Sequence, residues 1–74
     1  MKTVTQKSWL GTPPSHCDIC KVELSTEFYD FRVPTVGQWA NGCKACFTSY
    51  GGRLGTGLGQ QYAKQDGKFI KVGG

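Results

Sequence analysis

The sequence predicts a small α+β domain that is stabilised by a bound metal ion, and three observations support this fold class. The chain has 74 residues, of which 38% are hydrophobic, so an apolar core alone would give only marginal stability. Its four cysteines form two Cys-x2-Cys pairs. Aromatic and β-branched residues lie between the pairs and again near the C-terminus, as expected for short strands.

The first sixteen residues are expected to form an irregular N-terminal arm. The arm contains Gly11-Thr12-Pro13-Pro14, and two successive prolines disfavour both helix and strand. We interpret Trp9 and Leu10 as the residues that anchor the arm on the core. The segment lacks the apolar run and the cleavage site of a signal peptide, so we expect the reducing cytoplasm as the protein's location.

A β-hairpin and a short helix are predicted next. Residues 27–33 combine aromatic and β-branched side chains as in a half-buried strand, and Pro34-Thr35-Val36-Gly37 is a turn signal. Residues 38–40 form the returning strand in this interpretation, and Asn41-Gly42 predicts a second tight turn. A short helix is expected to start within residues 46–50 and to end at the two glycines that follow.

An Asp-Gly turn at residues 66–67 predicts a C-terminal β-hairpin. With a two-residue turn, Lys64 lies opposite Phe69 and Tyr62 lies opposite Lys71. Directly opposite residues share one face of a hairpin, so two lysines and two aromatic rings are expected side by side.

The two cysteine pairs predict a closed zinc site. A gap of two residues lets both sulfurs of a pair face one ion, and two such pairs fill a tetrahedral Zn–S site. Disulfides would require an export signal, and a redox dithiol normally occurs singly beside a βαβ unit. Covalent haem needs a histidine after the second cysteine, where this chain has Lys21 and Phe47. Neither pair is followed by the glycine that rubredoxin-like iron sites usually carry. The predicted zinc ligands are Cys17, Cys20, Cys43 and Cys46.

No catalytic site is predicted. Four thiolates leave no coordination position for water or substrate, so the zinc would be structural. His16 is the only histidine, and it has no nucleophile or carboxylate at a recognisable catalytic spacing. We therefore expect neither a ligand role for His16 nor enzymatic activity.

A glycine-rich loop follows the second cysteine pair. Half of the positions from 51 to 60 are glycine, at 51, 52, 55, 57 and 59. The spacing fits neither a P-loop nor a dinucleotide-binding turn, and a slack linker would not contain Leu54 and Leu58. We predict a compact loop with several positive-φ turns, held by these leucines against Trp39 or Phe47. We divide the single domain into the arm (1–16), a zinc-binding module (17–50), this loop (51–60) and the C-terminal hairpin (61–74).

Positive charge is concentrated in the second part of the chain. The net charge is +4: residues 1–31 carry three lysines and four acids, whereas residues 32–74 carry six basic residues and one acid. Arg53 and Thr56 are expected to face outward from the glycine loop. Four thiolates on a divalent metal add −2, so the loaded protein would carry about +2. The basic balance therefore supports nucleic-acid binding only weakly.

Several short sequence motifs, taken in their order along the chain, resemble those of a family of small zinc-finger proteins of tailed bacteriophages. They are GTPP at 11–14, CDIC at 17–20, GQWANGC at 37–43, CF at 46–47 and GTGLGQQY at 55–62. The resemblance covers about residues 11–74. It implies a treble-clef or zinc-ribbon-like fold, the four cysteines as zinc ligands, and the host cytoplasm or the virion as the location. It implies no settled activity.

Two functions are expected from these observations. The first is a non-enzymatic module that binds DNA or RNA through the basic second half, with Tyr50, Tyr62 or Phe69 stacking on bases. The candidate contact residues are Lys44, Arg53, Tyr62, Lys64, Lys68 and Lys71. Alternatively, the lysines only solvate a hairpin edge.

The second function is structural: a zinc-stabilised protein that docks on a phage or host protein, for example within the virion. No stretch approaches the ~18 apolar residues of a membrane span, and no small-molecule substrate is expected.

Overall fold

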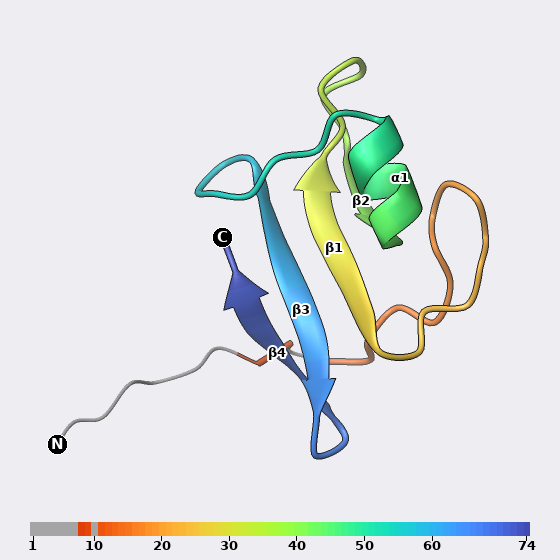
Figure 1. Cartoon of the computed structure of the whole chain (residues 1–74), viewed down its shortest axis with the longest axis vertical. Coiled ribbons are helices and arrows are strands. Elements are labelled where there is room, and N and C mark those ends of the chain that lie inside the picture. Colours follow the sequence, from red (N-terminus) through yellow and green to blue (C-terminus); the bar gives the residue numbers. More distant parts are fainter. Residues whose placement is uncertain (1–7, 10) are drawn as a thin grey trace, which may run out of the picture.

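The protein, seen in a computed structural model that describes residues 8–9 and 11–74, is a small α+β domain (Figure 1). Its elements are β1 (Glu27–Arg32), β2 (Trp39–Gly42), α1 (Lys44–Ser49), β3 (Gly59–Gln65) and β4 (Lys68–Gly73). The strands form one antiparallel sheet in the order β2-β1-β3-β4, and α1 lies beside β1 and β2. The expected α+β class and the order of the elements are confirmed. In the described part of the chain, no helix has the length and apolar character needed to span a membrane.

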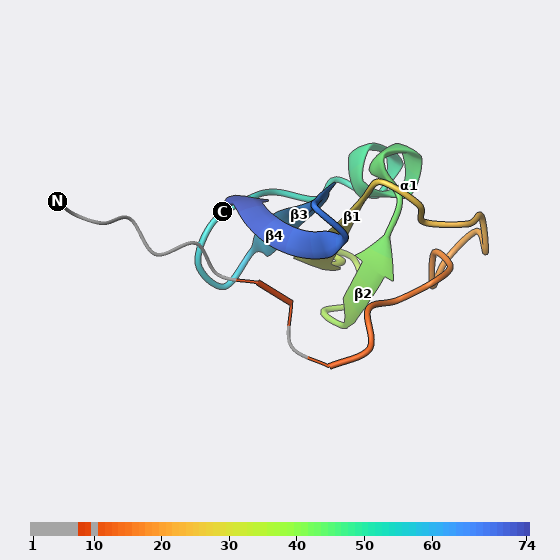
Figure 2. The ribbon, with the colours of Figure 1, turned by 90° about the horizontal axis from the view of Figure 1, so that it is seen from below.

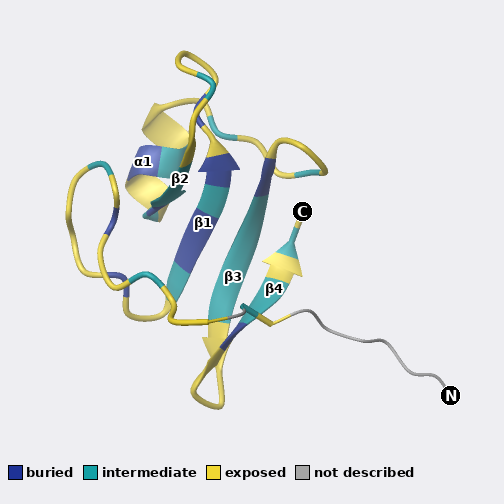
Figure 3. Cartoon of the chain, turned by 180° about the vertical axis from the view of Figure 1, so that it is seen from behind, coloured by how far each residue is buried: buried dark blue, intermediate teal, exposed yellow. Residues whose placement is uncertain are grey.

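Strand β1 is the centre of the core and is buried on both faces, not on one face as the sequence predicted (Figure 3). On one face, Tyr29 and Phe31 pack against Phe47 of α1, with ring centroids 4.2 and 5.2 Å away. On the other face, Phe28 stacks on Tyr62 of β3 at 5.1 Å. Two apolar clusters result, one on each side of the sheet, because both faces of β1 have a covering element.

The arm provides the cover for the second cluster. The N–H of Trp9 donates a hydrogen bond to the carbonyl of Phe69 at 2.9 Å, and Ser8 bridges Ile70, so this segment runs along β4 (Figure 2). The indole of Trp9 meets Phe28 and Tyr62 edge-on, at 5.2 and 5.3 Å. The predicted anchoring role of Trp9 is confirmed. Leu10, its predicted companion, lies outside the described residues.

The hairpin between β1 and β2 turns at Pro34–Gly37, as predicted. The N–H of Gly37 closes the turn on the carbonyl of Val33 at 2.7 Å. The second predicted turn is wrong, because Asn41 and Gly42 belong to β2. A Cβ on Gly42 would lie 2.9 Å from the ring of Phe31, so the glycine is explained by close packing and not by a turn.

The C-terminal hairpin has the predicted register. Lys64 pairs with Phe69 and Tyr62 pairs with Lys71, around a turn in which Asp66 and Gly67 both have positive φ. Positive φ at both central positions is typical of the type I′ turn that suits the right-handed twist of the strands.

The helix ends in a Schellman motif at the glycine loop. The N–H of Gly51, at φ +74°, donates to Thr48, and the N–H of Gly52 donates to Phe47, at 3.2 and 2.7 Å. Tyr50 is the C-cap residue of α1, and its side chain is exposed. The motif therefore satisfies the last carbonyls of the helix and reverses the chain toward β3.

The glycine loop is compact, and its path depends on close backbone approach. A Cβ on Gly59 would lie 2.5 Å from the carbonyl oxygen of Arg53 and 2.9 Å from Cβ of Phe31. The predicted anchoring by Leu54 and Leu58 is wrong, since these side chains are 40% and 43% exposed. Glycines, not leucines, pack the loop on the core. Arg53 and Thr56 are exposed, as expected.

Candidate metal centre

The first cysteine pair lies in a tight backbone turn. The N–H of Lys21 donates to the carbonyl of Cys17 at 3.0 Å, and the N–H of Cys17 donates to Val22 at 2.8 Å. Two further N–H groups, of Ile19 and Cys20, point at the sulfur of Cys17 at 3.4 Å each. Backbone donors aimed at a sulfur favour its thiolate form, which is the form that binds metal.

The second pair is positioned by the start of α1. Cys43 is the N-cap residue and Cys46 lies in the first turn, where the N–H of Phe47 donates to Cys43 at 2.9 Å. Residues three apart lie on the same side of a helix, so both sulfurs face the first turn. Phe47, the next residue, lies about 100° further round the helix and packs on Tyr29 of β1.

The four sulfurs converge on one point. All of them lie within 4.8 Å of one another, and Cys20 and Cys43 are 3.7 Å apart. A tetrahedron with Zn–S bonds of ~2.3 Å has sulfurs about 3.8 Å apart, which fits this arrangement. A disulfide requires ~2.05 Å, so the four cysteines are free thiols. The predicted grouping of the ligands is confirmed as a four-cysteine cluster that can hold a metal ion.

The pKa values of Cys17 and Cys46 are shifted in opposite directions. Burial opposes ionisation of Cys17, but backbone N–H groups, that of Cys20 foremost, outweigh it and lower its pKa to about 6. Burial, together with hydrogen bonds to the other three cysteines, raises the pKa of Cys46 to about 12. Binding of a metal ion to all four must therefore displace a tightly held proton from Cys46.

The cluster connects three parts of the fold. Asp18 donates its N–H to the carbonyl of Asn41 at 2.9 Å and accepts the N–H of Asn41 on its carboxylate at 2.8 Å, which fixes the first turn to the outer edge of β2. Cys17 and Cys46 belong to the same apolar cluster as Phe28. A metal ion at this point would join the first turn, the helix and the sheet.

His16 lies outside the cluster. Its ring nitrogen Nδ1 is 2.9 Å from the hydroxyl of Ser15, and its side chain is exposed. Among residues 8–9 and 11–74, the four cysteines are the one group of His, Cys, Asp and Glu side chains arranged to hold a metal.

The predicted nucleic-acid contacts are spread over several elements. Lys44 begins α1, Arg53 lies in the glycine loop, and Lys64 and Lys68 lie on the C-terminal hairpin, all exposed. Lys71 is half-buried. These residues therefore do not form one patch on one element.

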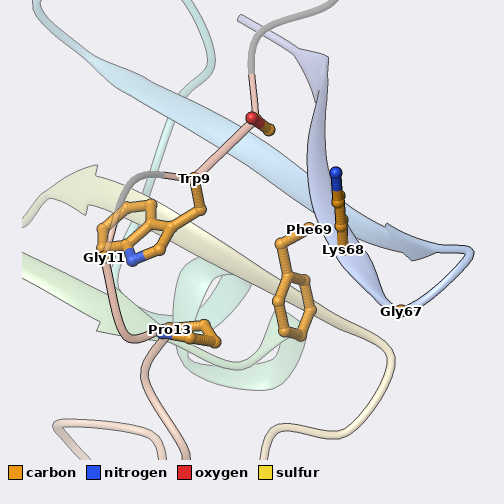
Figure 4. A pocket seen from close by; sticks show the side chains of 7 residues that line it. Trp9, Gly11, Pro13, Gly67, Lys68 and Phe69 are labelled. Atoms are coloured by element: carbon orange, nitrogen blue, oxygen red, sulfur yellow. The ribbon is translucent and has the colours of Figure 1, made fainter.

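Two of the three aromatic rings expected to stack on bases are engaged in the core. Phe69 is buried, and Tyr62 is packed between Phe28 and Trp9. The hairpin does have the predicted face shared by two lysines and two aromatic rings, but this face points toward the arm. Lys64 extends over Phe69 there, with its Nζ 6.0 Å from the ring centroid. Figure 4 shows Phe69 facing Trp9 across a pocket of about 310 Å³. Of these three rings, Tyr50 is the open one, with 45% of its surface exposed.

Arg32 is the one basic residue of the segment 32–74 that was not among the predicted contacts. It ends β1, which was interpreted only as a core strand. A signal was present, because residues 31–65 contain no aspartate or glutamate, and both arginines of the chain fall in this stretch.

Fold and site together define a small α+β domain with a four-cysteine cluster that can hold a metal ion. No family model, no curated protein and no solved structure matches the chain. Its function must therefore be argued from its own geometry and charge.

Proposed function

We propose that the protein is a non-enzymatic zinc finger that binds nucleic acid through the basic residues of its second half, residues 32–74. The observation that carries this proposal is the closed four-sulfur cluster, which leaves no coordination position for a reacting ligand. A domain whose metal is structural acts by presenting a surface. The surface of residues 31–65 presents basic side chains and no carboxylate.

Zinc is the metal that the ligand set favours. Four thiolates suit zinc or iron and exclude the oxygen-seeking ions Mg²⁺ and Ca²⁺. The order of a cysteine turn, a hairpin and a helix that carries the second pair supports the treble-clef form of zinc finger. Metal analysis of the purified protein tests the assignment: one zinc per chain is expected, and iron in its place would refute it.

The resemblance to small zinc-finger proteins of tailed bacteriophages gives the proposal its setting. In this setting the protein acts in the cytoplasm of the infected host cell. A basic surface on a small metal-stabilised fold suits contact with phosphates there.

A titration of the zinc-loaded protein with labelled duplex DNA and with single-stranded RNA, at low and near-physiological salt, tests nucleic-acid binding. Saturable binding that weakens steeply with salt is expected, because bound phosphates release counterions. Absence of binding at low salt would refute this function.

Docking on a phage or host protein is the second candidate function. The observation that favours it is a pair of exposed apolar side chains at the β1–β2 end, Val36 and Trp39, exposed by 65% and 47%. The charge of about +2 expected for the zinc-loaded protein also suits a protein partner as well as a nucleic acid. If the titration described above shows no nucleic-acid binding, docking on a protein becomes the favoured function. The protein would then be a component of the virion.

A further inference from the structure

A cleft separate from the cysteine cluster opens at the other end of α1. Three segments meet there: the end of β1 with the turn that follows it, the last turn of the helix, and the glycine loop (Figure 1). The cleft has a volume of about 570 Å³, within the range of ligand sites. We name it the arginine cleft after Arg32 and Arg53, which line it together with Tyr50 and Leu58.

The walls of the arginine cleft are fixed by backbone hydrogen bonds. The N–H of Arg32 donates to the carbonyl of Leu58 at 3.0 Å, which joins the end of β1 to the glycine loop. The Schellman motif at Gly51 holds Tyr50 at the end of the helix. Because the backbone of each wall is held, the site is largely formed before a ligand arrives, which reduces the entropy lost on binding.

The charge of the arginine cleft favours an anion. Arg32 and Arg53 contribute two guanidinium groups, and no carboxylate lines the cleft. The hydroxyl-bearing residues Thr35 and Ser49 also line it. Guanidinium groups bind phosphate oxygens in a bidentate manner and remain charged at every physiological pH.

The apolar part of the arginine cleft favours a ligand with a flat ring. Tyr50 and Leu58 are 45% and 43% exposed, so both side chains leave apolar surface open to a ligand in the cleft. The tyrosine ring has two χ angles and loses little entropy when a base stacks on it. Arginines that hold a phosphate beside an aromatic ring that holds a base are the usual means of binding single-stranded nucleic acid.

We propose that the arginine cleft binds one nucleotide unit of a single-stranded nucleic acid, with its phosphate on Arg32 and Arg53 and its base on Tyr50. This inference rests on the proposed function and deepens it, because it names the strand type and the contact residues. A base inside a duplex keeps both faces stacked on its neighbours, so only an unpaired base can lie on Tyr50.

Fluorescence anisotropy with a labelled 12-nucleotide oligo-U RNA tests the phosphate contacts. The variant R32Q/R53Q is compared with K64Q/K68Q. The second variant also removes two positive charges, but from the C-terminal hairpin. We expect a loss of at least tenfold in affinity for the arginine variant and of about threefold or less for the lysine variant. The slope of log K against log salt should fall by about 1.4 for the arginine variant, at about 0.7 per contact.

The two proposals fail in different ways. Lack of binding by the unmodified zinc-loaded protein at low salt overturns the proposed function and this inference together. Binding that falls equally in both double variants overturns the inference alone, since general attraction would then explain it. Circular dichroism and zinc content confirm the folded state of each variant, and R53Q against K64Q gives the same comparison if R32Q/R53Q is unfolded.

Substitution of Tyr50 tests the stacking contact. Y50F keeps the ring and should bind within twofold of the unmodified protein, whereas Y50L should lose roughly five- to hundredfold. An equal loss in both variants, or equal affinity for the RNA and for a duplex DNA of the same length, would overturn the assignment of a base to this ring.

Discussion

Tyr29 of β1 and Phe47 of α1 stack on each other, with ring centroids 4.2 Å apart and ring planes 20° apart. Phe47 directly follows Cys46, so the residue that seats the helix on the sheet is the neighbour of a metal-binding cysteine. The packing of the helix and the binding of the metal are therefore expected to be coupled. Each should weaken when the other is removed.

Replacement of one cysteine should abolish the folded state. Cys43→Ser removes a thiolate from the closed cluster and, with it, most of a binding free energy that is about 10–16 kcal/mol for structural zinc. We expect loss of bound zinc by metal analysis and loss of cooperative unfolding by circular dichroism. EDTA should unfold the unmodified protein in the same way.

His16→Gln is the matched control for the cysteine variant. It lies beside Cys17 but outside the cluster, so it should retain zinc and a normal unfolding transition. A folded, zinc-free Cys43→Ser protein would contradict the structural role of the site.

Truncation of the stacked ring should weaken both packing and metal binding. Phe47→Ala removes the contacts with Tyr29 and Phe31 and should reduce the free energy of unfolding by about 3 kcal/mol. Zinc affinity, measured by competition with a chelator, should fall with it. Tyr50→Ala at the exposed end of the same helix is the control and should change stability by about 0.5 kcal/mol or less.

The glycine loop should be sensitive to a methyl group where its backbone approaches the core. Gly59→Ala would place Cβ 2.5 Å from the carbonyl oxygen of Arg53, and it should cost about 2–3 kcal/mol. Gly57→Ala has free space around it and should cost only about 1 kcal/mol, from its positive φ. Chemical denaturation compares the two, and equal losses would show that the loop does not pack as described.

Asp30 should destabilise the protein at neutral pH. Burial and the charge of Asp18 raise its pKa, so the folded state holds this proton more tightly than the unfolded state does. The penalty is absent below the unfolded pKa and grows as pH rises from the unfolded pKa to the folded one, so it is present at pH 7. Asp30→Asn should therefore raise the melting temperature at pH 7, and this gain should disappear below the unfolded pKa of aspartate, about 3.9. A lower melting temperature for Asp30→Asn would contradict the assignment.

Local sequence signals were sufficient for the order of the elements, the grouping of the four cysteines and the final hairpin. The two-residue spacing of each cysteine pair and the Asp-Gly turn determine structure within a few neighbouring residues. These features can therefore be predicted without knowing which distant segments contact them. The pairing of Lys64 with Phe69 followed directly from the turn length.

Features that depend on distant segments were missed. Asn41-Gly42 has the composition of a turn, but its glycine is needed because the ring of Phe31 lies 2.9 Å from where a Cβ would be. Tyr62 and Phe69 look available in the sequence, but Phe28 of β1 and Trp9 of the arm, both distant in the chain, enclose them. Arg32 and Arg53 line one cleft because the glycine loop returns to the end of β1, which no local pattern encodes.

The indole of Trp9 covers Phe28 and Tyr62. A fragment that keeps the packing of this domain must therefore include the arm as well as the four-cysteine module. A fusion protein or a minimal zinc finger cut at Cys17 would keep every metal ligand and still uncover a ring pair that is now sealed. Such a fragment would still hold a metal ion on its four sulfurs and yet self-associate through the uncovered rings. For this protein, metal content alone is therefore a poor criterion for choosing where to cut the chain.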